Sequence, residues 1–114
     1  MSDCIFCKIA DRKIPSRVVH EDAETLAFED LNPQAPVHVL VIPKRHVAGA
    51  NDLTEEHDAV VGRLLRVAAK VAAERGVAQS GYRIVANTNR DGGQTVFHLH
   101  LHVLGGRPMQ WPPG

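Results

Sequence analysis

The spacing of apolar residues predicts one long helix in the middle of the chain. Between residues 54 and 75 apolar side chains recur every three or four positions, which is the repeat of a helix with one buried face. Thr54 suits the N-cap, and Gly76 lies just past the expected end. A short helix is expected over residues 4–12, because apolar residues there fall on one side and Pro15 prevents its continuation.

Shorter apolar segments bounded by polar or proline-containing stretches are typical of strands. Residues 21–24 are suited to a hairpin turn, and residues 89–93 to a second turn rich in glycine. We expect strands at residues 18–20, 25–29, 37–42, 82–86 and 96–104. Since strands and helices do not alternate regularly, this order favours an antiparallel sheet with helices packed on it, an α+β fold.

Length, charge and composition narrow the class of protein. A chain of 114 residues is expected to form a single domain over residues 1–114. Its 13 basic and 13 acidic residues cancel, so no basic excess indicates binding to nucleic acid or to a membrane surface. No apolar run approaches the roughly 20 residues needed to span a bilayer, and no signal peptide is evident, so a cytoplasmic location is expected.

Three histidines alternate with apolar residues near the end of the chain. In a strand, His98, His100 and His102 would share one face, roughly 6.5–7 Å apart. Three imidazoles on one face are hard to explain by packing, because each buried ring needs a hydrogen-bond partner. Imidazole can act as nucleophile, general acid or metal ligand near neutral pH, so the pattern indicates a reactive site. The alternative is a solvated face that happens to be rich in histidine.

The loop before these histidines, residues 91–95, contains two glycines. Glycines allow the backbone to approach a ligand closely and to turn its N–H groups toward an anion. On its own this loop would be an ordinary turn. Next to three histidines it predicts a phosphate-binding loop.

The segment 98–104 has the pattern H-φ-H-φ-H-φ-φ, in which φ is an apolar residue. This pattern resembles the signature of the histidine-triad (HIT) superfamily. Residues 30–38, 41–46, 91–94 and 105–114 are also similar to the Hint branch of that superfamily, the nucleoside phosphoramidase group. The resemblance extends from about Cys4 to the last residue.

This resemblance implies a fold and a reaction. The fold would be a roughly five-stranded antiparallel sheet with one long and one short helix, continued across a homodimer. The reaction would be hydrolysis of purine nucleoside 5′-phosphoramidates at the α-phosphate, which releases AMP or GMP and an amine without a need for Mg²⁺. His100 matches the nucleophile that forms a nucleotidyl-histidine intermediate, while His102 and His38 match residues that bind phosphate oxygens and orient it.

The resemblance also assigns binding residues. Asp30 and Leu31 match contacts to the ribose. Thr95 matches a phosphate contact, although the animal Hint proteins carry serine there. The other implied phosphate contacts are Asn87, Gly93 and Gln94, and the implied walls of the base pocket are Ile5, Phe6, Ile9 and Phe28.

The two cysteines are spaced C-x-x-C, which in a reducing compartment suggests a metal site or a redox pair. Structural zinc commonly takes two cysteine and two histidine ligands. Relatives with this motif imply that the ligands are Cys4, Cys7, His46 and His98, so that His98 would be both a member of the triad and a zinc ligand. The alternative is a pair of reduced, partly buried thiols.

Other functions remain open from the sequence. Within the superfamily the chain could be a dinucleoside polyphosphate hydrolase or another nucleotidyl transferase. It could be a metal hydrolase in which the three histidines bind a catalytic ion. It could also be a regulatory module that binds nucleotide with little turnover. The segment Trp111-Pro112-Pro113 resembles one near the leaving group in the Hint branch, and its alternative role is to cover an apolar subunit edge.

Overall fold

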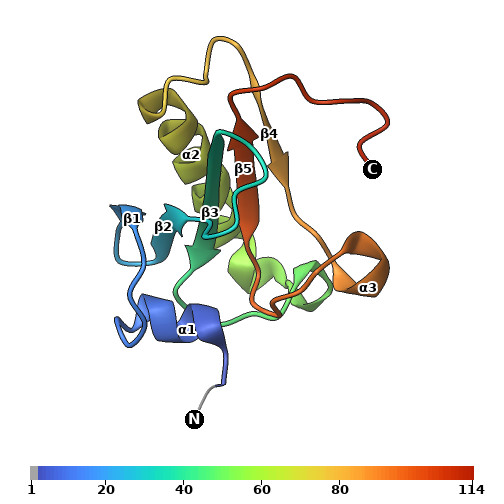
Figure 1. Cartoon of the computed structure of the whole chain (residues 1–114). Coiled ribbons are helices and arrows are strands. Elements are labelled where there is room, and N and C mark those ends of the chain that lie inside the picture. Colours follow the sequence, from blue (N-terminus) through green and yellow to red (C-terminus); the bar gives the residue numbers. More distant parts are fainter. Residues whose placement is uncertain (1–2) are drawn as a thin grey trace.

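A five-stranded antiparallel sheet forms the centre of the computed structural model, which describes residues 3–114 (Figure 1). The strands lie in the order β1-β2-β3-β5-β4, and every neighbouring pair is antiparallel. Their bounds are Val18–Glu21 for β1, Thr25–Glu29 for β2, Val37–Pro43 for β3, Tyr82–Val85 for β4 and Leu101–Gly105 for β5. The predicted α+β class and the number of strands are therefore confirmed.

The long helix α2 (Asp58–Glu74) packs against one face of the sheet (Figure 1). The helix expected from residue 54 begins with a 3-10 turn, Glu55–His57, before it continues as α2. Thr54 caps that turn, because its hydroxyl accepts a hydrogen bond from the backbone N–H of Glu56. The core between α2 and the sheet includes the apolar residues Ala27, Val39, Val41, Leu64, Val67, Ala68, Val71, Ala72, Leu99, Leu101 and Val103.

The short helix α1 (Ile5–Ala10) packs on the opposite face of the sheet. Phe6 meets Phe28 edge to face, with ring centroids 5.4 Å apart. The second core, between α1 and the sheet, consists of Phe6, Ile9, Leu26, Phe28, Leu40 and Ile42. No helix among residues 3–114 is both long and apolar enough to span a membrane.

The strand predicted over residues 96–104 is shorter than expected, because β5 begins only at Leu101. Its partner β3 ends at Pro43, which lacks an N–H and cannot extend the ladder. The backbone N–H of Leu99 instead donates to the carbonyl of Val47 at 2.7 Å. The alternation of side chains continues even so: Leu99 belongs to the core beneath α2, and His98 lies against Phe6 of α1.

Smaller differences from the prediction occur elsewhere: α1 is shorter than residues 4–12, and β1 and β3 each extend one residue beyond the predicted strand. The turn expected at residues 89–93 is a short helix, α3 (Asn89–Gly92), which ends at Gly93 with φ +80°. The fourth strand ends at Val85 rather than at residue 86.

Candidate active site

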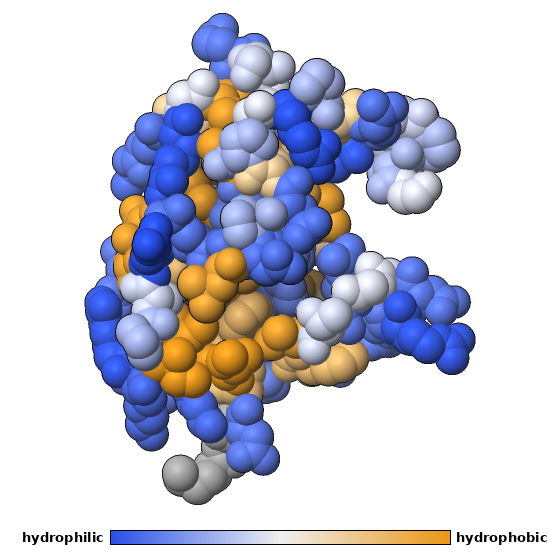
Figure 2. Space-filling view, viewed as in Figure 1, coloured by the Kyte–Doolittle hydropathy of each residue, from blue (hydrophilic) through white to orange (hydrophobic). Residues whose placement is uncertain are grey.

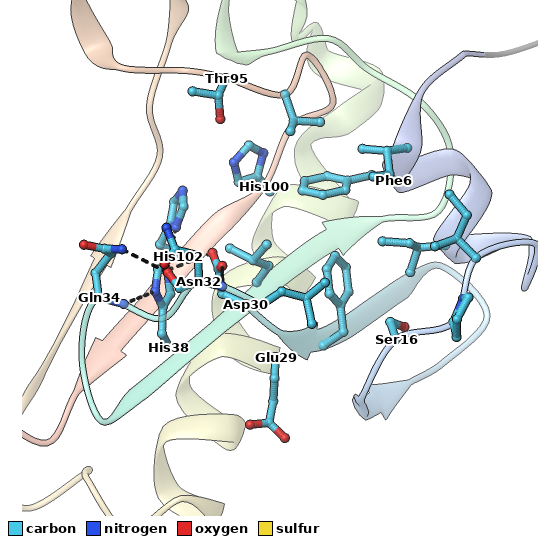
Figure 3. A pocket seen from close by; sticks show the side chains of 18 residues that line it. Phe6, Ser16, Glu29, Asp30, Asn32, Gln34, His38, Thr95, His100 and His102 are labelled. Carbon is cyan, nitrogen blue, oxygen red and sulfur yellow. Dashed lines mark hydrogen bonds and ion pairs between the residues drawn. The ribbon is translucent and has the colours of Figure 1, made fainter.

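A cavity of about 530 Å³ opens on the face of the sheet that carries α1. Apolar side chains gather on this face of the molecule around α1 (Figure 2). The close-up shows His38 and His102 on one side of the cavity and Phe6 on the other, with the ring of Phe6 beside that of His100 (Figure 3). This volume lies within the range of small-molecule sites. The lining is formed by Ile5, Phe6, Ile9, Ile14, Pro15, Ser16, Phe28, Glu29, Asp30, Leu31, Asn32, Gln34, His38, Leu40, Thr95, Val96, His100 and His102.

Most of the residues expected to contact a nucleotide line this cavity. All four expected base-pocket residues, both ribose residues and Thr95 are among them, together with His38, His100 and His102. Those that do not line it are Asn87, Gly93, Gln94 and His98.

Gln94 is buried, and its amide is used within the protein. Its Nε2 donates to the carbonyls of Ala48 at 2.8 Å and Val96 at 3.1 Å. Its Oε1 accepts from the backbone N–H of Asn89 at 2.8 Å. The side chain therefore fixes the loop before the histidines, rather than pointing into the cavity.

The proton on the His100 ring is placed by the backbone. The Nδ1 atom lies 2.7 Å from the carbonyl oxygen of His98, and a carbonyl can only accept a hydrogen bond. The proton of the neutral ring is therefore on Nδ1, and Nε2 carries a lone pair. A buried imidazole with its lone pair free at Nε2 has the form required of a nucleophile.

His38 and His102 form a directed hydrogen-bonded pair. The backbone N–H of Gln34 donates to Nδ1 of His38 at 3.0 Å, so the proton of His38 is on Nε2. That Nε2 donates to Nδ1 of His102 at 2.9 Å. His102 consequently carries its own proton on Nε2. The ring of His102 lies next to that of His100, with centroids 4.9 Å apart. The candidate nucleophile therefore has beside it a ring whose Nε2 is protonated.

Burial keeps this histidine pair neutral. Burial, together with the nearby rings of His100 and His38, lowers the pKa of His102 to about 4, and Asp30 opposes the change only in part. Burial also lowers the pKa of His38, against the effect of Asp30, whose Oδ2 lies 3.4 Å from Nε2 of His38. Both rings are therefore uncharged at neutral pH, and they act as N–H donors rather than as cations.

The third histidine belongs to a different cluster, the Cys/His cluster of Cys4, Cys7, His46 and His98. Nδ1 of His98 lies 3.3 Å from Sγ of Cys4, 3.5 Å from Sγ of Cys7 and 3.2 Å from Nδ1 of His46. Tetrahedral zinc with sulfur and nitrogen ligands has ligand–ligand separations of about 3.3–3.8 Å. The spacing in the cluster is close to that geometry.

The protonation of His98 also fits a ligand. Its Nε2 lies 2.7 Å from the carbonyl of Pro43, so Nε2 carries the proton and Nδ1 presents its lone pair to the cluster. A histidine ligand that donates its other N–H to a carbonyl is the usual arrangement at metal sites. Burial lowers the pKa of the His98 ring, partly offset by the bond to Pro43, so the ring is neutral as a ligand must be. The four residues of the Cys/His cluster can thus hold a metal ion.

A second group with metal-ligand atoms, Asp30, His38 and His102, lies within the cavity. A metal ion needs a free lone pair on each ligand nitrogen, and His38 offers none. Its Nε2 is protonated and donates to His102, and its Nδ1 accepts from the backbone N–H of Gln34. This weighs against a catalytic metal held by the three histidines, since His98 also faces the Cys/His cluster.

Some cavity residues were not predicted. Gln34 sets the tautomer of His38 through its backbone N–H, which no side-chain pattern could have revealed. Ser16 follows α1, Asn32 lies between β2 and β3, and Val96 precedes β5. All three line the cavity because the fold brings these segments together. Only Asn32 and Gln34 lie within a segment that had been singled out, residues 30–38.

Fold and site together define a small α+β protein with a buried histidine, whose Nε2 lone pair is free, beside a cavity of small-molecule size. Residues 11–109 match the HIT domain family, and the chain belongs to that family. It is 50% identical over 107 residues to a protein of Escherichia coli (strain K12) named purine nucleoside phosphoramidase, with 94% of this chain and 90% of that protein covered.

Solved structures agree with this assignment. The chain is similar to a HIT family hydrolase from Legionella pneumophila Philadelphia 1, with a TM-score of 0.96 and 51% identity over 98% of this chain and all of the other. It is also similar to a histidine triad protein from Clostridium difficile, with a TM-score of 0.92 and 46% identity over 96% of each chain. The protein is a HIT-family hydrolase with this fold.

Proposed function

We propose that this protein hydrolyses purine nucleoside 5′-phosphoramidates at the α-phosphate, with His100 as the nucleophile. The observation that carries the proposal is the bond from Nδ1 of His100 to the carbonyl of His98, which leaves the lone pair of Nε2 available. The similarity to a protein named purine nucleoside phosphoramidase supports the choice of substrate.

Binding would use the cavity from end to end. The apolar wall of Ile5, Phe6, Ile9 and Phe28 would enclose the base, and Asp30 with Leu31 would contact the ribose. The phosphate would lie next to His100, His102 and Thr95, whose hydroxyl points toward His100 (Figure 3). Backbone N–H groups of the loop that holds Asn87, Gly93 and Gln94 would complete the phosphate site.

The reaction follows from the proton positions. The Nε2 lone pair of His100 attacks the α-phosphorus, the bond from phosphorus to the amine nitrogen breaks, and that nitrogen leaves with a proton taken from solvent. The ring becomes positively charged, and its Nδ1–H remains bonded to the carbonyl of His98. His102 donates its Nε2–H to a phosphate oxygen, supported by His38. Water then attacks phosphorus, the bond from phosphorus to Nε2 breaks, and the water loses a proton to solvent, which releases the nucleotide and restores neutral His100.

AMP release from adenosine 5′-phosphoramidate tests this proposal. We expect turnover in the wild type, with and without a chelator, and none above background in His100→Ala. His57→Ala is a matched control, because His57 lies outside the cavity at the start of α2. A folded wild type that binds AMP but releases none from the substrate would contradict the proposal.

We further propose that the metal of the Cys/His cluster is zinc, with a structural role. The donor set of two thiols and two imidazoles is one that zinc prefers, and it leaves no open position for a substrate. The ion would stabilise the position of His98 and, through its carbonyl, that of His100. Thiolate ligands persist in a reducing environment, which supports a cytoplasmic location.

We also propose that two chains form a homodimer whose sheets join. The strand β4 ends the sheet on one side with β5 as its neighbour, and such an edge presents unpaired backbone groups. Sedimentation velocity at micromolar concentration should give twice the chain mass of 12.5 kDa. A species of the single-chain mass would contradict the dimer.

A further inference from the structure

The end of the cavity farthest from the histidines contains one polar side chain, that of Ser16, which has no hydrogen-bond partner among residues 3–114. The cavity-lining residues between 3 and 16 are Ile5, Phe6, Ile9, Ile14, Pro15 and Ser16, of which Ser16 alone has a polar side chain. Ser16 lies opposite His100 and His102 across the cavity (Figure 3).

The hydroxyl of Ser16 makes no hydrogen bond to the described part of the chain, and the side chain is half-buried. The nearby carboxylate of Glu29 is already engaged, since it lies 3.4 Å from Nη2 of Arg75 and points away from the cavity (Figure 3). Ser16 therefore has both its donor and its acceptor capacity available at the apolar end of the cavity.

We infer that Ser16 determines specificity at the base, by hydrogen bonding to the group at position 6 of the purine. The inference rests on the proposed function, in which the α-phosphate lies at the histidines and the base reaches the opposite end. A serine hydroxyl accepts from the 6-amino group of adenine and donates to the 6-oxo group of guanine, so it serves both purines.

The apolar residues around Ser16 make its hydrogen bond to position 6 of the purine important for the choice of base. A base whose position 6 is buried against Ile9, Ile14 and Phe28 loses its bonds to water, and Ser16 replaces one of them. A pyrimidine ring ends nearer the ribose than the six-membered ring of a purine does, so its polar substituents would not reach Ser16. Discrimination between substrates is strongest where the wrong substrate leaves a buried polar group of the site without a hydrogen-bond partner.

The test compares Ser16→Ala with the wild type on two substrates, adenosine 5′-phosphoramidate and purine riboside 5′-phosphoramidate, which lacks the group at position 6. We expect the variant to raise KM for the adenosine substrate about 2- to 10-fold, the effect of one neutral hydrogen bond, with kcat unchanged. KM for the purine riboside substrate should not change. Ser80→Ala, a serine outside the cavity, should match the wild type on both.

The outcomes separate this inference from the proposed reaction. If the wild type does not distinguish the two substrates, or if Ser16→Ala changes both KM values equally, the role of Ser16 is wrong while the reaction stands. If the wild type hydrolyses neither, the proposed reaction fails. Calorimetric titration with AMP and purine riboside 5′-monophosphate then decides the role of Ser16. Weaker binding of AMP alone by Ser16→Ala supports it, and equal changes overturn it.

Discussion

At the scale of single residues, backbone groups decide what each histidine can do. The carbonyl of His98 places the proton of His100, the carbonyl of Pro43 places that of His98, and the amide of Gln34 places that of His38. Three chemically identical side chains in one segment thereby differ: His100 keeps a free lone pair at Nε2, His98 presents its lone pair to the Cys/His cluster, and His102 accepts from His38 and carries its proton on Nε2. The alternation in the sequence predicts that they share a face, but it carries no information on these proton positions.

The lowered pKa of His102 predicts that acid weakens the fold. The pKa of its ring is about 4 in the folded protein and about 6.5 when unfolded. Between these values the unfolded chain binds the extra proton, so the free energy of unfolding falls as pH is lowered from 6.5 toward 4. One such group contributes a slope of up to about 1.4 kcal/mol per pH unit, and His38 contributes in the same direction.

Urea denaturation at several values between pH 7 and pH 4.5 measures this slope. The carboxylate of Asp22, whose pKa is held low by hydrogen bonds from Thr25 and His20 that outweigh its desolvation, loses its stabilising effect only at lower pH. We expect a shallower slope in His102→Gln. An equal slope in the variant and the wild type would show that His102 is not the group responsible.

At the scale of elements, the helices were predicted better than the strand that carries the histidines. Periodicity, the N-cap Thr54 and the terminal Gly76 are local signals, and they located α2 to within a few residues. The start of β5 depends on Pro43 in another strand, and the pairing of His38 with His102 depends on the register of β3 with β5. Such contacts between distant segments are not encoded in local patterns.

The packing of α2 predicts opposite results at two neighbouring leucines. Leu64 is fully buried in the core beneath the helix, whereas Leu65 is 49% exposed. Leu64→Ala should lower the free energy of unfolding by about 2–5 kcal/mol, because it removes buried apolar surface and leaves a cavity. Leu65→Ala should change it by less than about 1 kcal/mol. Urea denaturation of both variants checks this, and similar losses would mean that α2 is not oriented as described.

Two glycines of the same helical region predict opposite signs for one substitution. Gly62 lies within α2, and a Cβ there would meet no heavy atom within 4 Å. Gly62→Ala should raise the free energy of unfolding by about 1 kcal/mol, because alanine is the better helix former. Gly76 has φ +77°, so Gly76→Ala should lower it by about 1–2 kcal/mol through backbone strain alone. Thermal denaturation of both variants should give shifts of opposite sign.

At the scale of the whole molecule, the Cys/His cluster joins parts of the chain that are far apart in sequence. Cys4 and Cys7 belong to the start of α1, His46 follows β3, and His98 precedes β5, 94 residues after Cys4. The C-x-x-C spacing predicts a metal site, but its histidine partners were identified through the resemblance to HIT proteins. The fold confirms that the four side chains meet.

A metal ion bound by this cluster must therefore stabilise the entire fold. An ion present at a thousand times its dissociation constant raises the free energy of unfolding by up to about 4 kcal/mol, less whatever it gains by binding the cysteines and histidines of the unfolded chain. We expect a chelator to lower the thermal midpoint of the wild type and added Zn²⁺ to restore it. Cys4→Ser/Cys7→Ser should start from the lower midpoint and respond to neither reagent. Metal analysis of the purified wild type should give one zinc per chain. If the chelator acts equally on the wild type and the double variant, the stabilising ion lies elsewhere, and the link from the cluster through the His98 carbonyl to His100 loses its basis.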